Sequence, residues 1–142
     1  IEEIKNNQKT GNSISWYQIG QKKTEGVYKA GKLTGLFTVW YENGLQKSDS
    51  TYSDGKLLEN TEWQYYENGN KKTEVNYKDG KKDGQWTFYH KNGRIKKEKY
   101  FNNGNKTGVW TSYNENGTKD GRWTSYYENG KLNDPFHQNP VQ

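Results

Sequence analysis

Glycine and aromatic residues return at regular intervals along the whole chain, and this pattern predicts the secondary structure. An aromatic residue followed by a turn that ends in glycine recurs at intervals of 24, 25, 24, 24 and 13 residues. A second glycine follows four of these glycines after 11 residues, and a third follows three of them after 15, with Glu59 breaking the rule. The chain is therefore a tandem repeat of about 24 residues. The first glycines of the units are Gly20, Gly44, Gly69, Gly93, Gly117 and Gly130.

Each repeat is predicted to form two short strands and two turns. In the clearest unit, residues 86–89 are a strand, 91–93 a turn, 94–101 the return strand and 102–104 a second turn. Ten of the 16 glycines follow Asn or Asp, the residue pairs typical of tight hairpin turns. Turns spaced this closely leave no room for a helix or a parallel crossover. The pattern predicts an all-β fold, an elongated single-layer antiparallel meander of about 11 strands.

Aromatic residues occupy three fixed positions of the repeat, and we expect these positions to form the inward face. Stacked repeats would place equivalent aromatic residues side by side and so stabilise neighbouring hairpins. Charged strand residues such as Lys72, Glu74, Lys96 and Glu98 are expected to face water. The first row is Tyr28, Tyr52, Tyr77 and Phe101; the second is Trp16, Trp40, Tyr65, Tyr89, Tyr113 and Tyr126; the third is Phe37, Trp86, Trp110 and Trp123, with Trp63 beside the exception Glu62.

The ends of the array follow from the same spacing. The repeats are expected to cover residues 1–133, and residues 134–142, with two prolines, to form an irregular tail. The last interval is 11 residues short, so we expect residues 110–113 to pair directly with 123–127 as a C-terminal cap. The chain opens without Met, which a removed signal peptide or a truncation would explain. The compartment is left open.

Composition indicates a thin, aromatic core. The 22 aromatic residues outnumber the 17 aliphatic residues Ile, Leu, Val and Ala, and each buried Trp or Tyr covers roughly 150–250 Å². The formal net charge is +5, with both signs mixed along the chain. The absence of cysteine excludes disulfides and thiol chemistry. No apolar stretch approaches the length of a membrane span.

The repeat resembles a known family. Residues 77–89 read Tyr-Lys-Asp-Gly-Lys-Lys-Asp-Gly-Gln-Trp-Thr-Phe-Tyr, which is similar to the MORN repeat pattern. The added Tyr-x-x-Asn-Gly motif, as in residues 65–69, resembles the bacterial MORN-repeat-variant group. Many members of that group are described as antitoxins of toxin–antitoxin systems. The resemblance implies a non-enzymatic protein–protein interaction module, an antitoxin or immunity-type scaffold that occludes a partner such as a toxin.

Catalysis is not predicted. His90 and His137 are the only histidines, and His90 stands where other units carry tyrosine. The spacings of a metal site or a catalytic triad are absent. We therefore expect no enzymatic activity, no cofactor and no metal.

Two candidate binding surfaces follow from the repeat. The aromatic rows are either only the core or also a trough that grips a protein partner; the candidate partner-binding residues are Trp16, Trp40, Tyr65, Tyr89, Tyr113 and Tyr126. Paired lysines are either a solvated face or a stripe for acidic phospholipid or a cell-envelope ligand. That candidate stripe is Lys71, Lys72, Lys96 and Lys97. Interspersed glutamates argue against nucleic acid, and the long repeat fits sugar- or choline-binding modules badly. The oligomeric state is left open.

Overall fold

The structure is a computed structural model that describes residues 2–5, 8–126 and 129–132. These residues form strands and turns, and no helix is found among them. No segment of the described chain therefore forms a helix with the length and apolar character that a membrane crossing requires. The chain divides into two compact units, Ile1–Glu62 and Trp63–Gln142. The tail predicted at 134–142 and residue 133, the last of the predicted array, lie outside the described residues.

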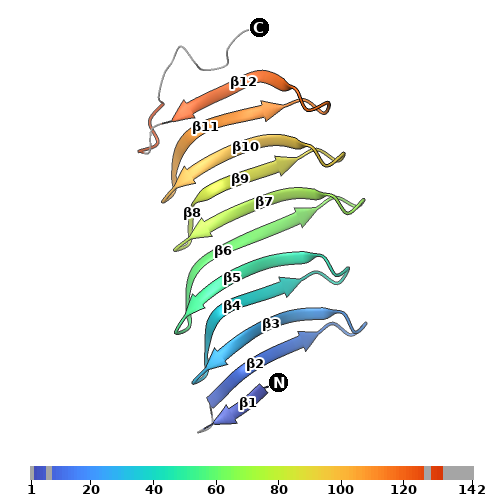
Figure 1. Cartoon of the computed structure of the whole chain (residues 1–142), viewed down its shortest axis with the longest axis vertical. Coiled ribbons are helices and arrows are strands. Elements are labelled where there is room, and N and C mark those ends of the chain that lie inside the picture. Colours follow the sequence, from blue (N-terminus) through green and yellow to red (C-terminus); the bar gives the residue numbers. More distant parts are fainter. Residues whose placement is uncertain (1, 6–7, 127–128, 133–142) are drawn as a thin grey trace. The chain divides into compact units, whose positions relative to one another are not determined.

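The first unit is a meander in which each strand pairs antiparallel with the next one along the chain (Figure 1). The last of its strands, β6, begins in this unit and ends in the second. The strands are β1 (Glu2–Lys5), β2 (Gln8–Trp16), β3 (Lys22–Lys29), β4 (Lys32–Trp40), β5 (Gln46–Ser53) and β6 (Lys56–Tyr65).

The second unit repeats the same arrangement. Its two-residue strand β8 pairs only with β7, and β9 takes up the pairing with β7 after a break at Asp83. The predicted all-β antiparallel meander is confirmed in both units. The strands are β7 (Lys71–Lys78), β8 (Lys81–Lys82), β9 (Gly84–Tyr89), β10 (Ile95–Asn102), β11 (Asn105–Tyr113) and β12 (Lys119–Tyr126).

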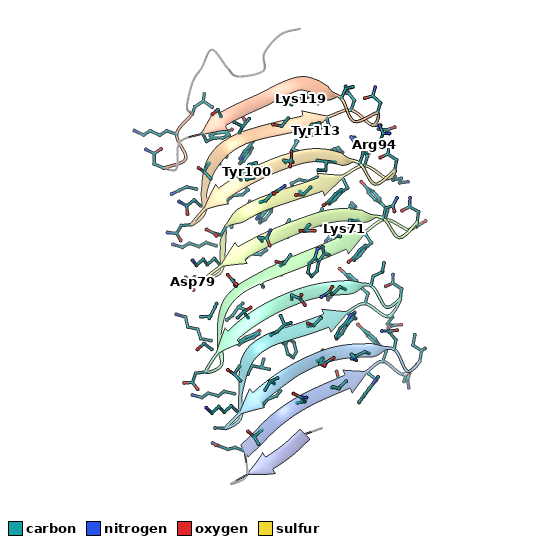
Figure 2. All side chains as sticks on the ribbon, in the orientation of Figure 1. Lys71, Asp79, Arg94, Tyr100, Tyr113 and Lys119 are labelled. Carbon is teal, nitrogen blue, oxygen red and sulfur yellow. The ribbon has the colours of Figure 1, made fainter. Side chains whose placement is uncertain are left out.

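Two kinds of turn alternate at opposite ends of the strands, as Asp79 and Arg94 illustrate in the second unit (Figure 2). At the end near Asp79, two-residue turns hold both central residues at positive φ, for example 50° at Asn103 and 89° at Gly104. This is the turn whose twist matches that of the paired strands. At the other end, the N–H of Gly93 donates to the carbonyl oxygen of His90 at 3.0 Å, which closes a longer turn. The sequence predicted turns at both places.

The aromatic rows lie on two faces of the sheet, and the expectation of a single inward face is wrong. In the second unit, rings of the first and third rows, together with Tyr126, form one continuous aromatic ladder. Neighbouring ring centroids along it are 5.3, 5.3, 5.2 and 4.9 Å apart. The second row apart from Tyr126 lies on the opposite face, because side chains alternate along a strand and Trp86 and Tyr89 are three positions apart in β9. The aromatic ladder is Tyr77, Trp86, Phe101, Trp110 and Tyr126, and its side of the sheet is called the ladder face.

The ladder is the packing centre of the second unit. Phe101, at its middle, is the one hydrophobic side chain among the described residues that is classed as buried, with 7% of its surface exposed. The indole N–H groups of Trp86 and Trp110 donate to backbone carbonyl oxygens of Asn76 and Tyr100 at 2.7 and 3.0 Å. Each ring is thus fixed in position by hydrogen bonding as well as by packing. The thin aromatic core follows the prediction from composition.

The shortened last repeat changes the position of one predicted site residue. Strand β11 pairs directly with β12, with Trp110 opposite Thr124 and Tyr113 opposite Lys119. Tyr126 therefore ends a return strand, and its ring stacks on Trp110 at 4.9 Å. The prediction that grouped Tyr126 with Trp16 and the rest of the second row is wrong, since Tyr126 lies on the ladder face.

Candidate functional site

The second aromatic row, without Tyr126, occupies the face opposite the ladder. Tyr65, Tyr89 and Tyr113 belong to the second unit, and Trp16 and Trp40 to the first. All stand beside the longer turns, where β2, β4, β6, β9 and β11 end. Trp16 is 59% exposed, and the other four are half-buried. This arrangement leaves the row accessible from solvent in each unit.

In each unit, a row of carboxylates lies beside these rings. Its members are one repeat apart, and each stands opposite a threonine in an adjacent strand: Glu25 and Asp49 opposite Thr38, and Glu98 opposite Thr111. The threonines are among the most buried side chains described, with Thr38 at 7% and Thr87 at 4% exposure. The row defines what is called the carboxylate face. It consists of Glu25 and Asp49 in the first unit and Glu74 and Glu98 in the second.

Hydrogen bonds fix each carboxylate in the sheet. In the second unit, Glu74 accepts from the indole Nε1 of Trp63 at 3.0 Å and from Nζ of Lys71 at 2.8 Å. The hydroxyl of Tyr113 donates to Glu98 at 2.9 Å. The prediction that Glu74 and Glu98 simply face water is therefore wrong. Both are half-buried, and each accepts a hydrogen bond from a tryptophan or tyrosine side chain.

The first unit holds its carboxylates in a similar way. Asp49 accepts from the hydroxyl of Thr38 at 2.7 Å and from the side-chain amide of Gln46 at 2.8 Å. Glu25 forms an ion pair with Lys22 at 2.6 Å, and Nζ of Lys22 lies 5.3 Å from the ring centre of Trp40. Aromatic ring, cation and carboxylate therefore form one connected surface.

Electrostatic effects follow from these contacts. Burial acts to raise the pKa of Glu74, but the hydrogen bonds from Lys71 and Trp63 outweigh it, so that this pKa lies below its ordinary value. The hydrogen bond to Glu74 raises the pKa of Lys71. Burial, with the nearby charge of Glu74, raises the pKa of Tyr89. Burial and the Glu98 carboxylate likewise raise the pKa of Tyr113. Tyr89 and Tyr113 thus stay neutral hydrogen-bonding groups.

A ladder of hydrogen bonds joins equivalent turns of successive repeats. The hydroxyl of Tyr66 donates to the carbonyl oxygen of Tyr89 at 2.6 Å, and Tyr17 makes the same bond in the first unit at 2.7 Å. In the next repeat, Nε2 of His90 lies 2.8 Å from the carbonyl oxygen of Tyr113. His90, which stands where other units carry tyrosine, therefore also fills the structural place of that tyrosine. This ladder holds the ends of the aromatic row rigid.

The four lysines proposed as a stripe do not lie in one row. Lys71 is held by Glu74 on the carboxylate face, whereas Lys97 is opposite Phe88 on the ladder face. Equivalent positions in the repeat are instead occupied by exposed lysines that follow each longer turn. Three of them lie over the turn tyrosines, with Nζ 5.4 to 5.8 Å from the ring centres. These outer lysines are Lys23 and Lys47 in the first unit and Lys72 and Lys96 in the second.

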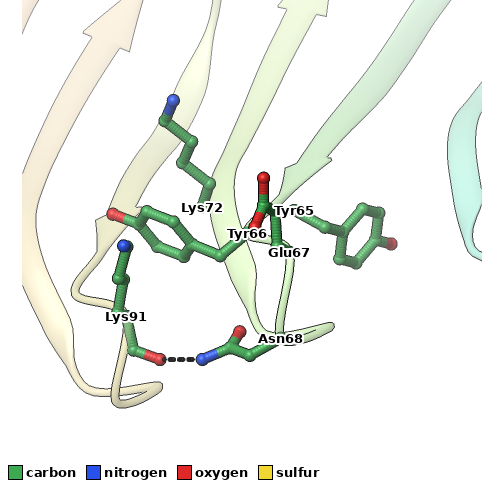
Figure 3. A pocket seen from close by; sticks show the side chains of 6 residues that line it. All are labelled: Tyr65, Tyr66, Glu67, Asn68, Lys72 and Lys91. Atoms are coloured by element: carbon green, nitrogen blue, oxygen red, sulfur yellow. Dashed lines mark hydrogen bonds between the residues drawn. The ribbon is translucent and has the colours of Figure 1, made fainter.

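A half-open hollow of about 570 Å³ lies beside one of these turns (Figure 3). Tyr65, Tyr66 and Lys72 line it, and Asn68 closes its floor by donating to the carbonyl oxygen of Lys91 at 2.9 Å. Its walls are thus the outer lysine and the hydrogen-bonded turn. Within the part of the chain that the structure describes, no group of three or more His, Asp or Glu side chains could hold a metal ion.

Stacked hairpins with side chains exposed on both faces define a class of protein, the tandem β-repeat scaffold that binds its partners by a surface. Three segments match the family model described as MORN repeat variant: residues 58–79, 82–103 and 119–133. The chain carries repeats of this family, which confirms the resemblance seen in the sequence. MORN repeats are generally non-enzymatic modules that bind proteins or membranes. A search of curated proteins gives no significant match.

Proposed function

We propose that this chain is a protein-binding module that covers its partner with the carboxylate face. The observation that carries the proposal is the division of the aromatic residues between two faces. The ladder supplies the packing of the second unit, whereas Tyr65, Tyr89 and Tyr113 stand on the other side. Large aromatic residues that packing does not require, set beside polar groups, are typical of the energetic centres of protein interfaces.

The geometry supports a rigid, preorganised surface. The hydrogen bonds between turns of successive repeats fix the ends of the strands, and the hydrogen bonds to Glu74 and Glu98 fix the side chains between them. A surface that is ordered before binding loses little conformational entropy when the partner arrives. The carboxylates would favour a partner that offers basic or hydrogen-bond-donating groups. Neutralisation of a toxin by occlusion is the specific form of this function that the family resemblance implies.

The test compares two exposed side chains of the first unit. Trp16 is 59% exposed on the carboxylate face, and Ile19 is 72% exposed in the neighbouring turn. After affinity capture from the source cell has supplied a partner, its affinity is measured for Trp16→Ala and for the matched control Ile19→Ala. Loss of an interface aromatic residue should weaken binding about tenfold or more, and the control should change it less than about twofold.

Two outcomes would oppose the proposal. Equal affinity of Trp16→Ala and the wild-type protein would place the interface elsewhere. Equal losses in both variants would indicate a general effect on folding, which circular dichroism of each variant would reveal. In the second unit, Tyr113→Ala gives an independent measurement on the same face.

A second candidate function rests on the outer lysines. Lys72 and Lys96 are exposed and one repeat apart, a placement suited to acidic phospholipid head groups. Flotation with vesicles that contain phosphatidylserine would test this, using charge reversal of both residues and reversal of Lys56 and Lys78 as the control. Vesicle binding that is abolished by reversal of Lys72 and Lys96, but not by reversal of Lys56 and Lys78, would favour this function over the protein-binding one.

A further inference from the structure

Three lysines of the second unit lie directly on the aromatic ladder. Nζ of Lys82 is 4.8 Å from the ring centre of Trp86 and 5.1 Å from that of Phe101. Lys99 lies 4.9 Å from Trp110, and Lys106 lies 5.0 Å from the same ring on which Tyr126 also stacks. We call Lys82, Lys99 and Lys106 the ladder lysines.

The ladder lysines form a patch of uncompensated positive charge. Among the described residues, no carboxylate lies within ion-pair distance of any of them. Burial, together with the charges of Lys97, Lys82 and Lys106, lowers the pKa of Lys99. The carboxylates Glu74 and Glu98 are turned to the other face, where they are already hydrogen-bonded. Positive charge is therefore concentrated on the ladder face, and the neighbouring ammonium groups repel one another.

The repeat itself does not require lysine at these positions. In the second unit, Lys82 and Lys106 stand opposite the return-strand aromatic residues Tyr77 and Phe101. In the first unit, the residues opposite Tyr28 and Tyr52 are Leu33 and Leu57. Leucine there packs on the ring without any electrostatic cost.

Lys99 departs from the first unit in the same way. Lys99 stands opposite Trp86, and the residue opposite the equivalent Phe37 is Ser50. The first unit has one comparable contact among its described residues, Lys9 over Tyr28 at 4.3 Å. Lys9 occupies the same repeat position in the first unit as Lys82 and Lys106 do in the second. The described residues of the second unit differ in that three lysines lie on adjoining rings, which the fold does not require.

We propose that the ladder face of the second unit is a docking site for an acidic polypeptide segment, rich in Asp or Glu. Charge complementarity carries this proposal: three ammonium groups without an ion-pair partner among the described residues stand on a wide surface, and Glu74 and Glu98 lie on the other face. Lys82 and Lys106 are one repeat apart, two strand spacings or roughly 10 Å. That spacing suits carboxylates about three residues apart on an extended chain.

Single-stranded nucleic acid fits this face less well. Bases bind such surfaces by stacking on open ring faces. Here the ring faces are occupied, because each lysine lies over one or two of them and neighbouring rings are tilted by 54 to 68°. The site is also distinct from the carboxylate face, so the inference does not rest on the proposed function. The two together describe a scaffold that joins two partners, one on each face.

The test uses the full chain and three probes: a labelled Asp/Glu-rich peptide, oligothymidylate of equal charge, and phosphatidylserine vesicles. The decisive variant carries Lys82→Leu, Lys99→Ser and Lys106→Leu, which copies the residues of the first unit and should fold. A matched control removes three exposed lysines elsewhere, Lys78→Gln, Lys91→Gln and Lys119→Gln. A third variant replaces the ladder lysines by arginine and keeps the charge.

The expected result is peptide binding that weakens as salt rises from about 50 mM to about 500 mM. It should fall about tenfold or more in the decisive variant, stay near wild type in the control and persist in the arginine variant. Equal loss in the control would overturn the proposal by showing a non-specific charge effect. It would also be overturned if the peptide failed to bind at low salt, or if oligothymidylate or vesicles bound more tightly through the same lysines. Failure here with an intact Trp16 effect would leave the proposed function standing.

Discussion

At the turn between β3 and β4, Ala30 adopts a φ of 50°, a left-handed backbone conformation that a side chain with Cβ disfavours. The following residue, Gly31, has a φ of 81° and tolerates it freely. The equivalent first residues of the other turns are Asp54, Asp79 and Asn103, each with a φ of 50 or 51°. Asp and Asn enter this region more readily because their short polar side chains hydrogen-bond locally. Ala30 is therefore the strained member of the set.

The size of the effect can be worked out from this geometry. A left-handed conformation costs an ordinary L-residue about 1–2 kcal/mol, and asparagine relieves a part of that cost. Ala30→Asn should raise the free energy of unfolding by about 1 kcal/mol. The reciprocal change, Asn103→Ala, should lower it by about the same amount. For a chain of this length, 1 kcal/mol corresponds to a shift of about 4 °C in Tm.

Thermal and urea unfolding followed by circular dichroism would measure both variants against the wild-type protein. The double variant should return close to wild-type stability if the two turns act independently. A lower Tm for Ala30→Asn, or an unchanged Tm for Asn103→Ala, would show that the turn conformation does not control stability here. Substitution of Asp54 by Asn serves as the control, because both residues suit the conformation and little change is expected.

Three further predictions concern the faces and the turn ladder. Because the pKa of Glu74 is lowered in the fold, its ion pair stabilises the protein at neutral pH and is lost as the pH falls through the folded value. Glu74→Gln should therefore cost about 0.5–1 kcal/mol at pH 7 and nothing in acid, and a constant difference in urea unfolding across pH would contradict this. His90→Tyr should leave Tm nearly unchanged, whereas His90→Ala should lower the free energy of unfolding by about 0.5–1.5 kcal/mol. Equal losses of stability in both variants would show that the hydrogen bond from residue 90 to the Tyr113 carbonyl oxygen does not stabilise the turns. The lowered pKa of Lys99 means that its charge opposes folding below that pKa, so Lys99→Met should stabilise the protein at pH 7. That gain should disappear above pH 10.5, the ordinary lysine value, and a stability loss at pH 7 would contradict the sign.

The sequence predicted the fold because the turns determine it. Asn-Gly and Asp-Gly pairs recur at a fixed interval, and a two-residue turn with both φ angles positive permits only an antiparallel hairpin. The register of β11 with β12 agrees with the expected pairing at Trp110 and Thr111, but Tyr113 stands opposite Lys119, outside the expected segment 123–127. The features that were predicted correctly depend on local spacing alone.

The assignment of residues to faces was less successful, for two different reasons. Trp86 and Tyr89 are three positions apart in one strand, so the alternation of side chains was enough to separate their rows. That signal was present in the sequence. The faces of the lysines could not be assigned in this way, because a bulge at Lys96 shifts the register between Phe88 and Tyr89. A bulge depends on pairing with the next strand, and counting along the chain does not reveal it.

The hydrogen bonds of the carboxylate face also lay beyond the sequence. Glu74 and Glu98 occupy the same position of the repeat, with lysines nearby, and this pattern by itself indicates a solvated surface. The extra residue before Gly69 turns Trp63 to the carboxylate face, where its indole reaches Glu74. A tryptophan displaced by one position was visible in the sequence, but its partner was defined only by the pairing of strands.

A sheet with a single layer has no second layer against which to bury a face, and this constrains where function can vary. In the second unit, packing comes from rings that cover one another along the ladder, centred on Phe101. Substitution of these rings therefore affects stability before it affects binding. Exposed residues that stand on the ladder, such as Lys82, can change with little loss of packing. Selection for binding a partner would therefore change residues at such positions. The clearest example is the repeat position that holds Leu33 in the first unit and Lys82 in the second.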